Sequence, residues 1–487
     1  MTKKYDFNEP ESLNLPPGQM KKLGYQVIDM IVDHIANIEE KPVHNYQNRS
    51  IYNSMLETSL PENGMDPSLI LEQVDKDILT GITHTDHPRF YGYVPGSGNF
   101  ISTLADAISS GFNIFAGHSF VGSSAAAVEA MTLDWLRQLM NFPIETAGVF
   151  VSGGSMANLT ALHAARTHVL GSPTGHDPAL VVYGTCQTHS TIKKALKILG
   201  FSPNQYKVIP VDEDLSMKMD VLRITIKQDI ENGLKPFVVI ATAGTTSSGA
   251  IDPLYEMRAI CDQYSLWMHV DGAYGAAAYL TKKGKKLLAG LEMADSLALD
   301  PHKWLFQPYE IGCLLVRNGH LLKNAFSMEA EYLREAKEVL DGSIEAEYYL
   351  SKEINFFDYG PQLTRSFRAL KLWMFFKTHG VKQLTKCIER GILIAEEVAH
   401  HINISNDWEI VTKPSIGVLN FRSKEKENRC EKKMRSAVEG LLNDGFALIT
   451  TTEIYEEKVF RLCLINPNVK YDDVIHSLNL LASLHIE

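Results

Sequence analysis

Short apolar runs alternate with helix-period segments from about residue 148 onward, and this alternation restricts the possible folds more than any other feature of the chain. The run at 149–151 precedes a helical stretch at 156–166. The run at 180–183 precedes a segment, 192–199, whose apolar residues repeat at the i, i+3, i+4, i+7 spacing of an amphipathic helix. Strands joined by helices pair in parallel and are covered on both faces. The pattern therefore predicts an α/β fold with a mostly parallel sheet.

The same rhythm continues and then changes toward the C-terminus. It predicts four more buried strands, at 236–242, 266–270, 296–299 and 311–316. Beyond about residue 380 it predicts a smaller α+β pattern, with strands near 408–411, 418–422, 446–451 and 459–465 and a last helix from Tyr471. We therefore expect an N-terminal helical segment (1–85), a large α/β domain (86–379) and a small C-terminal α+β domain (380–487).

An amphipathic helix is expected in the N-terminal segment, over residues 19–40. Its apolar residues, from Met20 to Ile38, fall on one face. A helix that lies on a membrane surface carries mostly Lys and Arg on its polar face, whereas acidic residues here balance Lys21 and Lys22. We therefore expect this face to pack against protein, at a dimer interface or in the core.

Charge and composition exclude several classes of protein. The 487 residues include 58 acidic and 47 basic ones, which gives a formal net charge of −11. Nucleic acids and anionic membranes attract a basic excess, so we expect a small-molecule partner, no nucleic acid and no membrane. The apolar runs are far shorter than the ~18 residues of a membrane span, and the first residues hold no apolar signal stretch. A cytoplasmic location is the resulting prediction.

Six cysteines are scattered along the chain. The nearest pair, Cys430 and Cys463, is 33 residues apart, and no CxxC occurs. This spacing indicates neither a zinc ribbon nor a disulfide framework. All six are expected to be reduced core residues.

Ligands of open α/β sheets bind at the carboxyl ends of the strands, so polar residues just after each strand are candidates for chemistry. The expected strand at 149–151 is followed by Ser152, Gly153, Gly154 and Ser155 at the start of a helix. Two glycines let an anion approach the backbone, and the helix dipole adds roughly half a positive charge. These residues form a candidate phosphate site; a tight turn with a serine N-cap is the alternative.

Four further strand ends carry polar residues, namely His189, Thr246, Asp271 and Lys303. A buried acid such as Asp271 requires a cation or several donors. Lys303, taken alone, is better explained as a snorkelling surface lysine, but a desolvated lysine has a lowered pKa and becomes a nucleophilic amine suited to a Schiff base. Together the five sites supply the groups that bind pyridoxal 5'-phosphate (PLP). They are a phosphate cradle, a carboxylate for the ring nitrogen, an imidazole for the ring face and a lysine for the aldehyde.

Other motifs are weaker. Gly96 and Gly98 lack the third glycine of a dinucleotide fingerprint, and no GxxxxGK[ST] occurs. His84, Asp86 and His87 offer metal ligands without a clear further partner. No metal is expected.

Four motifs resemble those of a known family, the group II PLP-dependent amino-acid decarboxylases. They are VSGGSMAN (151–158), TAGTT (242–246), HVDGAY (269–274) and PHKW (301–304), in the family's order. The resemblance runs from about residue 86 into the C-terminal domain and is greatest to aromatic L-amino-acid decarboxylases, especially bacterial tryptophan decarboxylase types. It implies the aspartate aminotransferase-like fold type I of PLP enzymes and a homodimer with shared active sites.

The resemblance also implies residue roles. Lys303 would carry the cofactor, Asp271 would pair with the ring nitrogen, His189 would stack on the ring, and Gly154 and Ser155 would hold the phosphate. The implied cofactor-binding set is Gly153, Gly154, Ser155, His189, Thr246, Asp271, Ala273, His302 and Lys303.

Two positions bear on the reaction and on the cofactor. Tyr332, in Glu331-Tyr332-Leu333, matches a tyrosine that in the family protonates the α-carbon after CO₂ leaves, with His189 as a further participant; a tyrosine on a surface helix is the alternative. Phenylalanine there accompanies aldehyde synthesis, so Tyr332 favours simple decarboxylation. Asp300 is a departure, because animal members tend to have Asn there and a second anion would repel the phosphate.

The implied substrate is an aromatic L-amino acid, with tryptophan slightly ahead of phenylalanine and tyrosine. By resemblance the pocket would combine Tyr93, Phe115 from the facing subunit, and Thr364, although these residues could equally belong to the core. Arg461 would bind the substrate carboxylate unless it forms a structural salt bridge. Two alternatives stay open: a decarboxylase of acidic amino acids, which needs an extra cation, and a catalytically silent PLP-fold binding protein.

Overall fold

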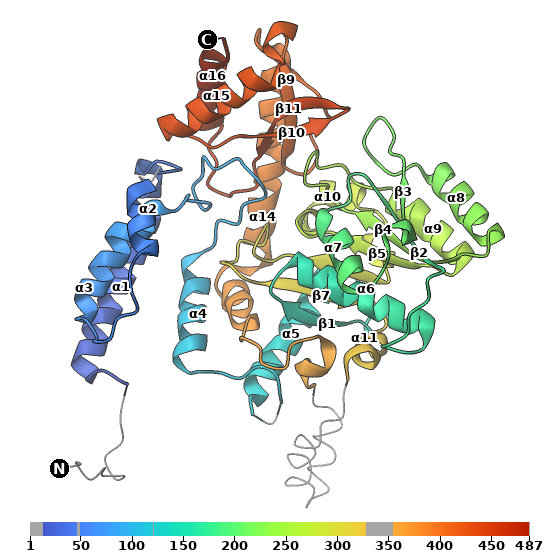
Figure 1. Cartoon of the computed structure of the whole chain (residues 1–487), viewed down its shortest axis with the longest axis horizontal. Coiled ribbons are helices and arrows are strands. Elements are labelled where there is room, and N and C mark those ends of the chain that lie inside the picture. The colour runs from blue at the N-terminus through green and yellow to red at the C-terminus, as the bar shows by residue number, and fades with distance from the viewer. Residues whose placement is uncertain (1–12, 46–48, 120, 328–353, 487) are drawn as a thin grey trace, which may run out of the picture.

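The computed structural model describes residues 13–45, 49–119, 121–327 and 354–486, and a seven-stranded sheet forms its centre (Figure 1). The strands lie in the order β1-β7-β6-β5-β4-β2-β3. Their bounds are β1 Ala147–Val151, β2 Leu180–Thr185, β3 Tyr206–Ile209, β4 Lys235–Thr242, β5 Trp267–Asp271, β6 Ser296–Leu299 and β7 Gly312–Val316. Only β7 is antiparallel to its neighbours β1 and β6. The mostly parallel α/β sheet predicted from the sequence is confirmed.

Helices cover the sheet on both faces. Successive residues of β5, β6 and β7 are all buried, although their side chains alternate between the two faces. Helix α6 contacts five of the strands, and α8 and α9 contact β4. The helices of this part are α4 Phe100–Gly111, α5 Ser123–Leu139, α6 Gly154–Leu170, α7 Ser190–Ile198, α8 Met219–Glu231, α9 Leu254–Tyr264, α10 Lys282–Leu287 and α11 Gly319–Phe326.

A second, four-stranded antiparallel sheet lies near the C-terminus, in the order β10-β11-β9-β8. Its elements are β8 Trp408–Ile410, β9 Val418–Ser423, α15 Glu431–Asp444, β10 Thr450–Ile454, β11 Glu457–Cys463 and α16 Tyr471–Ile486. The long helix α14, Ala369–Ile404, connects the two sheets (Figure 1). The expected domain boundary at residue 380 falls inside this helix, where Gly380 has a φ of 69° and interrupts the helical backbone.

Two strands differ from their predicted positions. The edge strand β3 was not expected, because most of its residues are only half-buried or exposed and its apolar pattern is weak. Strand β10 begins at Thr450 rather than at 446. The residues before it pair elsewhere, since Leu448 forms a bridge with Phe90.

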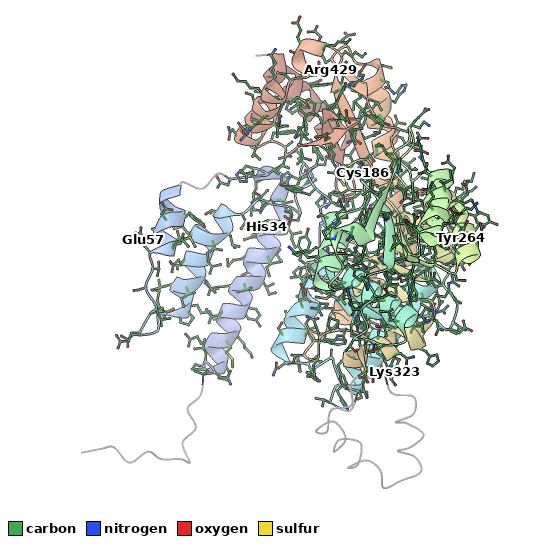
Figure 2. All side chains as sticks on the ribbon, turned by 45° about the vertical axis from the view of Figure 1, so that its right-hand side comes forward. His34, Glu57, Cys186, Tyr264, Lys323 and Arg429 are labelled. Carbon is green, nitrogen blue, oxygen red and sulfur yellow. The ribbon has the colours of Figure 1, made fainter. Side chains whose placement is uncertain are left out.

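The N-terminal helices stand apart from the rest of the chain. They are α1 Pro17–Ala36, α2 Arg49–Leu56 and α3 Pro67–Gln73. Both views show them beside the main body, with His34 on the inner helix and Glu57 on the outer side in Figure 2. No residue of α1 is buried. On its apolar stripe, Met20, Val27 and Ile35 are exposed in this single chain, whereas Leu23, Met30 and Ile31 are half-buried. Among the helices that the structure describes, none has the length and apolar character needed to cross a membrane.

All six cysteines are free, but they are not all core residues. Cys261, Cys313 and Cys463 are buried, whereas Cys186 and Cys430 are exposed. The prediction of a core position is wrong for these two because they lie in connecting segments, after β2 and before α15, and such segments run over the surface.

Candidate active site

A cavity of about 220 Å³ lies at the carboxyl ends of the central strands. It is lined by Gly153, Gly154, Ser155, Asn158, Gln187, His189, Thr191, Thr242, Gly244, Thr246, Asp271, Ala273, Tyr274, Asp300, His302 and Lys303. All nine residues of the expected cofactor-binding set are among them. Residues separated by up to 150 positions in the sequence therefore converge on one site.

The N-terminus of α6 forms one end of this cavity. Among the described residues no side chain caps the helix. The backbone N–H of Met156 already donates to the carbonyl oxygen of Gly153, so the N–H groups of Gly154 and Ser155 are the ones left to bind an anion. The glycines leave little space: a Cβ on Gly154 would lie 2.9 Å from Oδ2 of Asp300, and one on Gly153 would lie 3.1 Å from Cε1 of His302. Side chains at these positions would fill the cradle that glycine leaves open.

Asp271 ends β5 and is almost fully buried. Its Oδ1 accepts a hydrogen bond from the backbone N–H of Ala273 at 3.1 Å, and its Oδ2 accepts one from Nδ2 of Asn158 at 3.0 Å. These two fixed hydrogen-bond donors offset the free-energy cost of burying a carboxylate at this strand end.

Lys303 faces a second carboxylate. Its Nζ lies 3.0 Å from Oδ2 of Asp300. Burial alone would lower the pKa of Lys303, but the negative charges of Asp300 and Asp271 outweigh burial and hold this pKa above its ordinary value. The expectation that desolvation lowers the pKa of Lys303 is therefore wrong for the protein without its cofactor, because the adjacent Asp300 adds a negative charge that stabilises the ammonium form.

Asp300 is not turned away from the cradle. It is buried, its Oδ2 also lies 3.7 Å from Nε2 of His302, and its Oδ1 has no hydrogen-bond partner in the described part of the chain. Burial lowers the pKa of His302, which keeps this ring neutral more readily than a free histidine. Asp300 is thus the lining residue that fits a phosphate least.

His189 and Thr246 lie at the exposed mouth of the cavity. His189 precedes α7, and its Nδ1 lies 2.9 Å from Oγ1 of Thr191 and also accepts from the Thr191 backbone N–H. This capping interaction fixes the imidazole at the start of the helix. One face of its ring is consequently held at the cavity entrance.

The expected substrate residues do not line this cavity. Phe115 and the Leu363-Thr364 segment approach each other at Gly117, where Thr364 is exposed. Tyr93 is 69% exposed, and its carbonyl oxygen accepts a hydrogen bond from the buried guanidinium of Arg461. Tyr332 lies outside the described residues.

The guanidinium of Arg461 binds backbone rather than a carboxylate. Its Nε donates to the carbonyl oxygen of Thr246 at 2.7 Å, and its Nη1 donates to that of Tyr93 at 2.6 Å. Its Nη2 is buried without a partner among the residues described. Arg461 therefore ties two segments at the mouth together and keeps one donor atom unused.

Two residues of the site were not among the expected ones: Asn158, which lines the cavity, and His269, which bonds Asn158 but does not line the cavity. A usable signal existed for both. Asn158 lies four positions after Gly154 on α6 and so shares its face of the helix, while His269 lies two positions before Asp271 on β5 and so shares its face of the sheet.

A possible metal-ligand group lies away from this cavity. His34 on α1 joins His84 and Asp86, with their ligand atoms within 4.8 Å of one another. The sequence could not supply this third partner because it lies about 50 residues away. His34 already bonds Asp86 through Nε2 at 2.8 Å, and Nζ of Lys41 lies 3.3 Å from its Nδ1. The lysine places a positive charge where a cation would bind, so we assign no metal here.

Comparison with known proteins identifies the family to which this site belongs. The model of the "Pyridoxal-dependent decarboxylase conserved domain" matches residues 50–424. This chain belongs to the pyridoxal-dependent decarboxylase family. It is therefore a PLP-dependent amino-acid decarboxylase, a carboxy-lyase.

Relatives of this decarboxylase cover nearly its whole length. An aromatic-L-amino-acid decarboxylase of Bacillus atrophaeus is 41% identical over 481 residues, which are 97% of each chain. A solved structure of Oryza sativa TDC with PLP and tryptamine has a TM-score of 0.89 and 26% identity, covering 98% of this chain and 99% of that one. Catharanthus roseus tryptophan decarboxylase in complex with L-tryptophan has a TM-score of 0.87 and 26% identity, covering 98% and 100%.

The residues around the cavity fit the cofactor of the family. The α6 N-terminus and its two glycines suit a phosphate, Asp271 is a buried acceptor for a protonated ring nitrogen, and Lys303 is the lysine of the cavity. Oδ1 of Asp300, which has no partner among the described residues, fits a phosphate less well. Two anionic oxygens repel each other, and a hydrogen bond between them requires that one of them carry a proton.

Proposed function

We propose that this decarboxylase converts aromatic L-amino acids to aryl-alkylamines and CO₂, with PLP held in the cavity at the strand ends. The convergence of Lys303, Asp271 and the α6 N-terminus on one cavity carries the proposal. The full-length similarity to an aromatic-L-amino-acid decarboxylase supports the aromatic class.

The lining residues divide the work of the reaction. Bound PLP supplies an electron-withdrawing ring that accepts the electron pair left when CO₂ departs. Lys303 would hold the cofactor covalently through its amine. Asp271 would pair with the protonated ring nitrogen, His189 would cover the ring face, and Gly153, Gly154 and Ser155 would bind the phosphate, with Thr246, Ala273 and His302 completing the lining.

Return of a proton to the substrate α-carbon completes the reaction. We assign this step to Tyr332, which lies outside the described residues, with His189 at the cavity mouth as a participant. A phenolic proton donor at the α-carbon favours the amine as product over an aldehyde. Arg461 is our candidate for the substrate carboxylate, supported by its buried and unused Nη2.

Aromatic substrates suit the side chains that we propose for the substrate pocket. Phe115 and Thr364 occupy neighbouring segments, because Arg365 donates to the carbonyl oxygen of Ala116 at 3.1 Å and pairs with the buried Glu129. With Tyr93 they offer an apolar surface that carries the hydroxyl groups of Tyr93 and Thr364, and ring contacts add roughly 0.5–1.5 kcal/mol.

Comparing kcat/KM for four amino acids tests the substrate class. We expect tryptophan to be slightly better than phenylalanine and tyrosine, and all three to exceed glutamate by at least about 100-fold, because an unpaired buried carboxylate costs several kcal/mol. Thr364 could shift the order toward tyrosine without changing the class. A preference for glutamate would overturn the aromatic assignment, and the absence of turnover with all four would support a silent binding protein.

Replacing Asp300 with asparagine is expected to speed attachment of PLP at neutral pH. The carboxylate raises the pKa of Lys303, so its removal lowers that pKa and leaves more of the amine neutral and reactive. In the wild type the rate should rise with pH above neutrality, and in Asp300→Asn the rise should begin at lower pH. Stopped-flow absorbance over a pH series measures the rate of PLP attachment. Asp262→Asn, at an exposed position, is the control. Identical pH profiles would contradict this role.

We also propose that the protein is a homodimer with shared active sites, in which the exposed stripe of α1 packs against the second subunit. Met20, Val27 and Ile35 of this stripe are each at least 38% exposed in the single chain, and exposed apolar side chains along one face of a helix mark an interface. Light scattering at micromolar concentration should give about twice the 54.4 kDa chain mass. A monomer with full activity would remove the proposal. The cytoplasmic location stays a prediction from the sequence.

A further inference from the structure

A row of buried polar side chains runs behind Asp271, away from the cavity. Nδ2 of Asn158 is 3.0 Å from Oδ2 of Asp271, and Oδ1 of Asn158 is 2.9 Å from Nε2 of His269. Nδ1 of His269 is 2.8 Å from Oγ of Ser296, which is also 2.8 Å from Nε1 of Trp267. Asn158, His269 and Ser296 are at most 1% exposed. Three elements, β5, β6 and α6, meet along this row.

The hydrogen bonds of this row run in one direction. An indole N–H only donates, so Ser296 accepts from Trp267 and has its own proton left for Nδ1 of His269. Burial lowers the pKa of His269 to about 4, so the ring is neutral and carries one proton. The carboxylate of Asp271 requires an amide N–H of Asn158 to face it, so Oδ1 of Asn158 faces His269 and the proton of the ring is on Nε2. That proton is donated to Oδ1 of Asn158, which turns the amide N–H groups toward Asp271. The opposite amide orientation would set a carbonyl oxygen against a carboxylate.

The same amide reaches the other side of the cavity. Nδ2 of Asn158 lies 3.4 Å from Oγ1 of Thr191, whose hydroxyl is 2.9 Å from Nδ1 of His189. Asn158 therefore connects the acid on the cavity floor with the imidazole at its mouth. Neither Asp271 nor His189 contacts the other directly in the described hydrogen-bond network.

We propose that Asn158, oriented by His269 and Ser296, is a positioning residue that aims the carboxylate of Asp271 at the ring nitrogen of the cofactor and steadies the imidazole of His189 above the ring. This inference rests on the proposed function. The row satisfies its own buried polar groups, but apolar residues of similar volume would fill the same space without desolvation cost. Polar residues differ from apolar ones here because their row ends in a hydrogen bond from Asn158 to Asp271, and this hydrogen bond is their contribution to the site.

The test compares the affinity of the full-length protein for PLP and for an analogue with carbon in place of the ring nitrogen. Asn158→Leu is expected to weaken PLP binding by about 10-fold or more, because a hydrogen bond to a charged group is lost, and to weaken analogue binding by less than about 3-fold. Thr191→Val cuts only the branch to His189, so it should weaken both ligands by the same small factor. Ser296→Ala, which frees the His269 tautomer, gives the same selective comparison if Asn158→Leu does not fold.

Asn466 provides a matched control. It is an equally buried asparagine that donates to the backbone carbonyl of Asp86 at 2.9 Å and does not line the cavity. Asn466→Leu should lower Tm without changing the ratio of the two affinities. Equal weakening of both ligands by Asn158→Leu would make the row merely structural and overturn the inference. Failure of the wild type to bind PLP would instead contradict the proposed function itself.

Discussion

Replacing Lys303 with alanine is expected to reduce decarboxylation by at least about 10³-fold while leaving a folded protein. Lys303 is the lysine of the cavity, and its Nζ is held 3.0 Å from Asp300 rather than in the core packing of the sheet. Its loss therefore removes the amine that holds PLP covalently without removing structure. CO₂ release from labelled tryptophan measures the loss, and circular dichroism checks the fold.

A second lysine provides the control for this change. Lys286 on α10 is exposed and does not line the cavity, so Lys286→Ala should keep wild-type activity. PLP should leave Lys303→Ala on gel filtration and stay with Lys286→Ala. If Lys303→Ala still retained covalently bound cofactor, another lysine would be the site of PLP attachment.

Replacing Asp271 with asparagine is expected to lower kcat by about 10²–10³-fold, the range seen when a fixed electrostatic partner of a reaction is removed. The carboxylate accepts from Ala273 and Asn158 and keeps its remaining acceptor capacity for the cavity. An amide cannot hold the ring nitrogen protonated, so the ring withdraws electrons less strongly. Steady-state kinetics on each substrate give the value.

The outcome for Asp271→Asn is distinct from that for Lys303→Ala. Asp271→Asn should still hold PLP covalently, because the lysine is unchanged, and should bind it more weakly. Asp271→Glu restores the charge and should recover part of the activity. If Asp271→Asn retained wild-type kcat, the assigned contact with the ring nitrogen would be wrong.

The site could be predicted where the sequence ties chemistry to strand ends. The parallel sheet requires that residues after β1, β2, β4, β5 and β6 meet at one edge, so Gly154, Asp271 and Lys303 could be placed together from their positions alone. Strands such as β4 and β5 are buried on both faces, so their sequences are continuous apolar runs that could be recognised as strands.

The other properties of the site could not be predicted, because they depend on contacts between residues that are far apart in the sequence. The raised pKa of Lys303 follows from the direction in which Asp300 points, and the row behind Asp271 joins Asn158 and His269 across 111 positions. Strand β3 was missed because its half-exposed residues lack a clear pattern. The proposed substrate residues Phe115 and Thr364 lie away from the cavity of this chain, where a second subunit would be needed to bring them to it.

Mapping the attachment site of the cofactor tests the central claim most directly. Wild-type protein would be incubated with PLP, reduced with borohydride, digested and analysed by mass spectrometry. We predict a single pyridoxyl adduct on Lys303, in the segment Asp300-Pro301-His302-Lys303-Trp304, and its loss when an aromatic amino acid is added before reduction. An adduct on another lysine, or no adduct at all, would contradict the account.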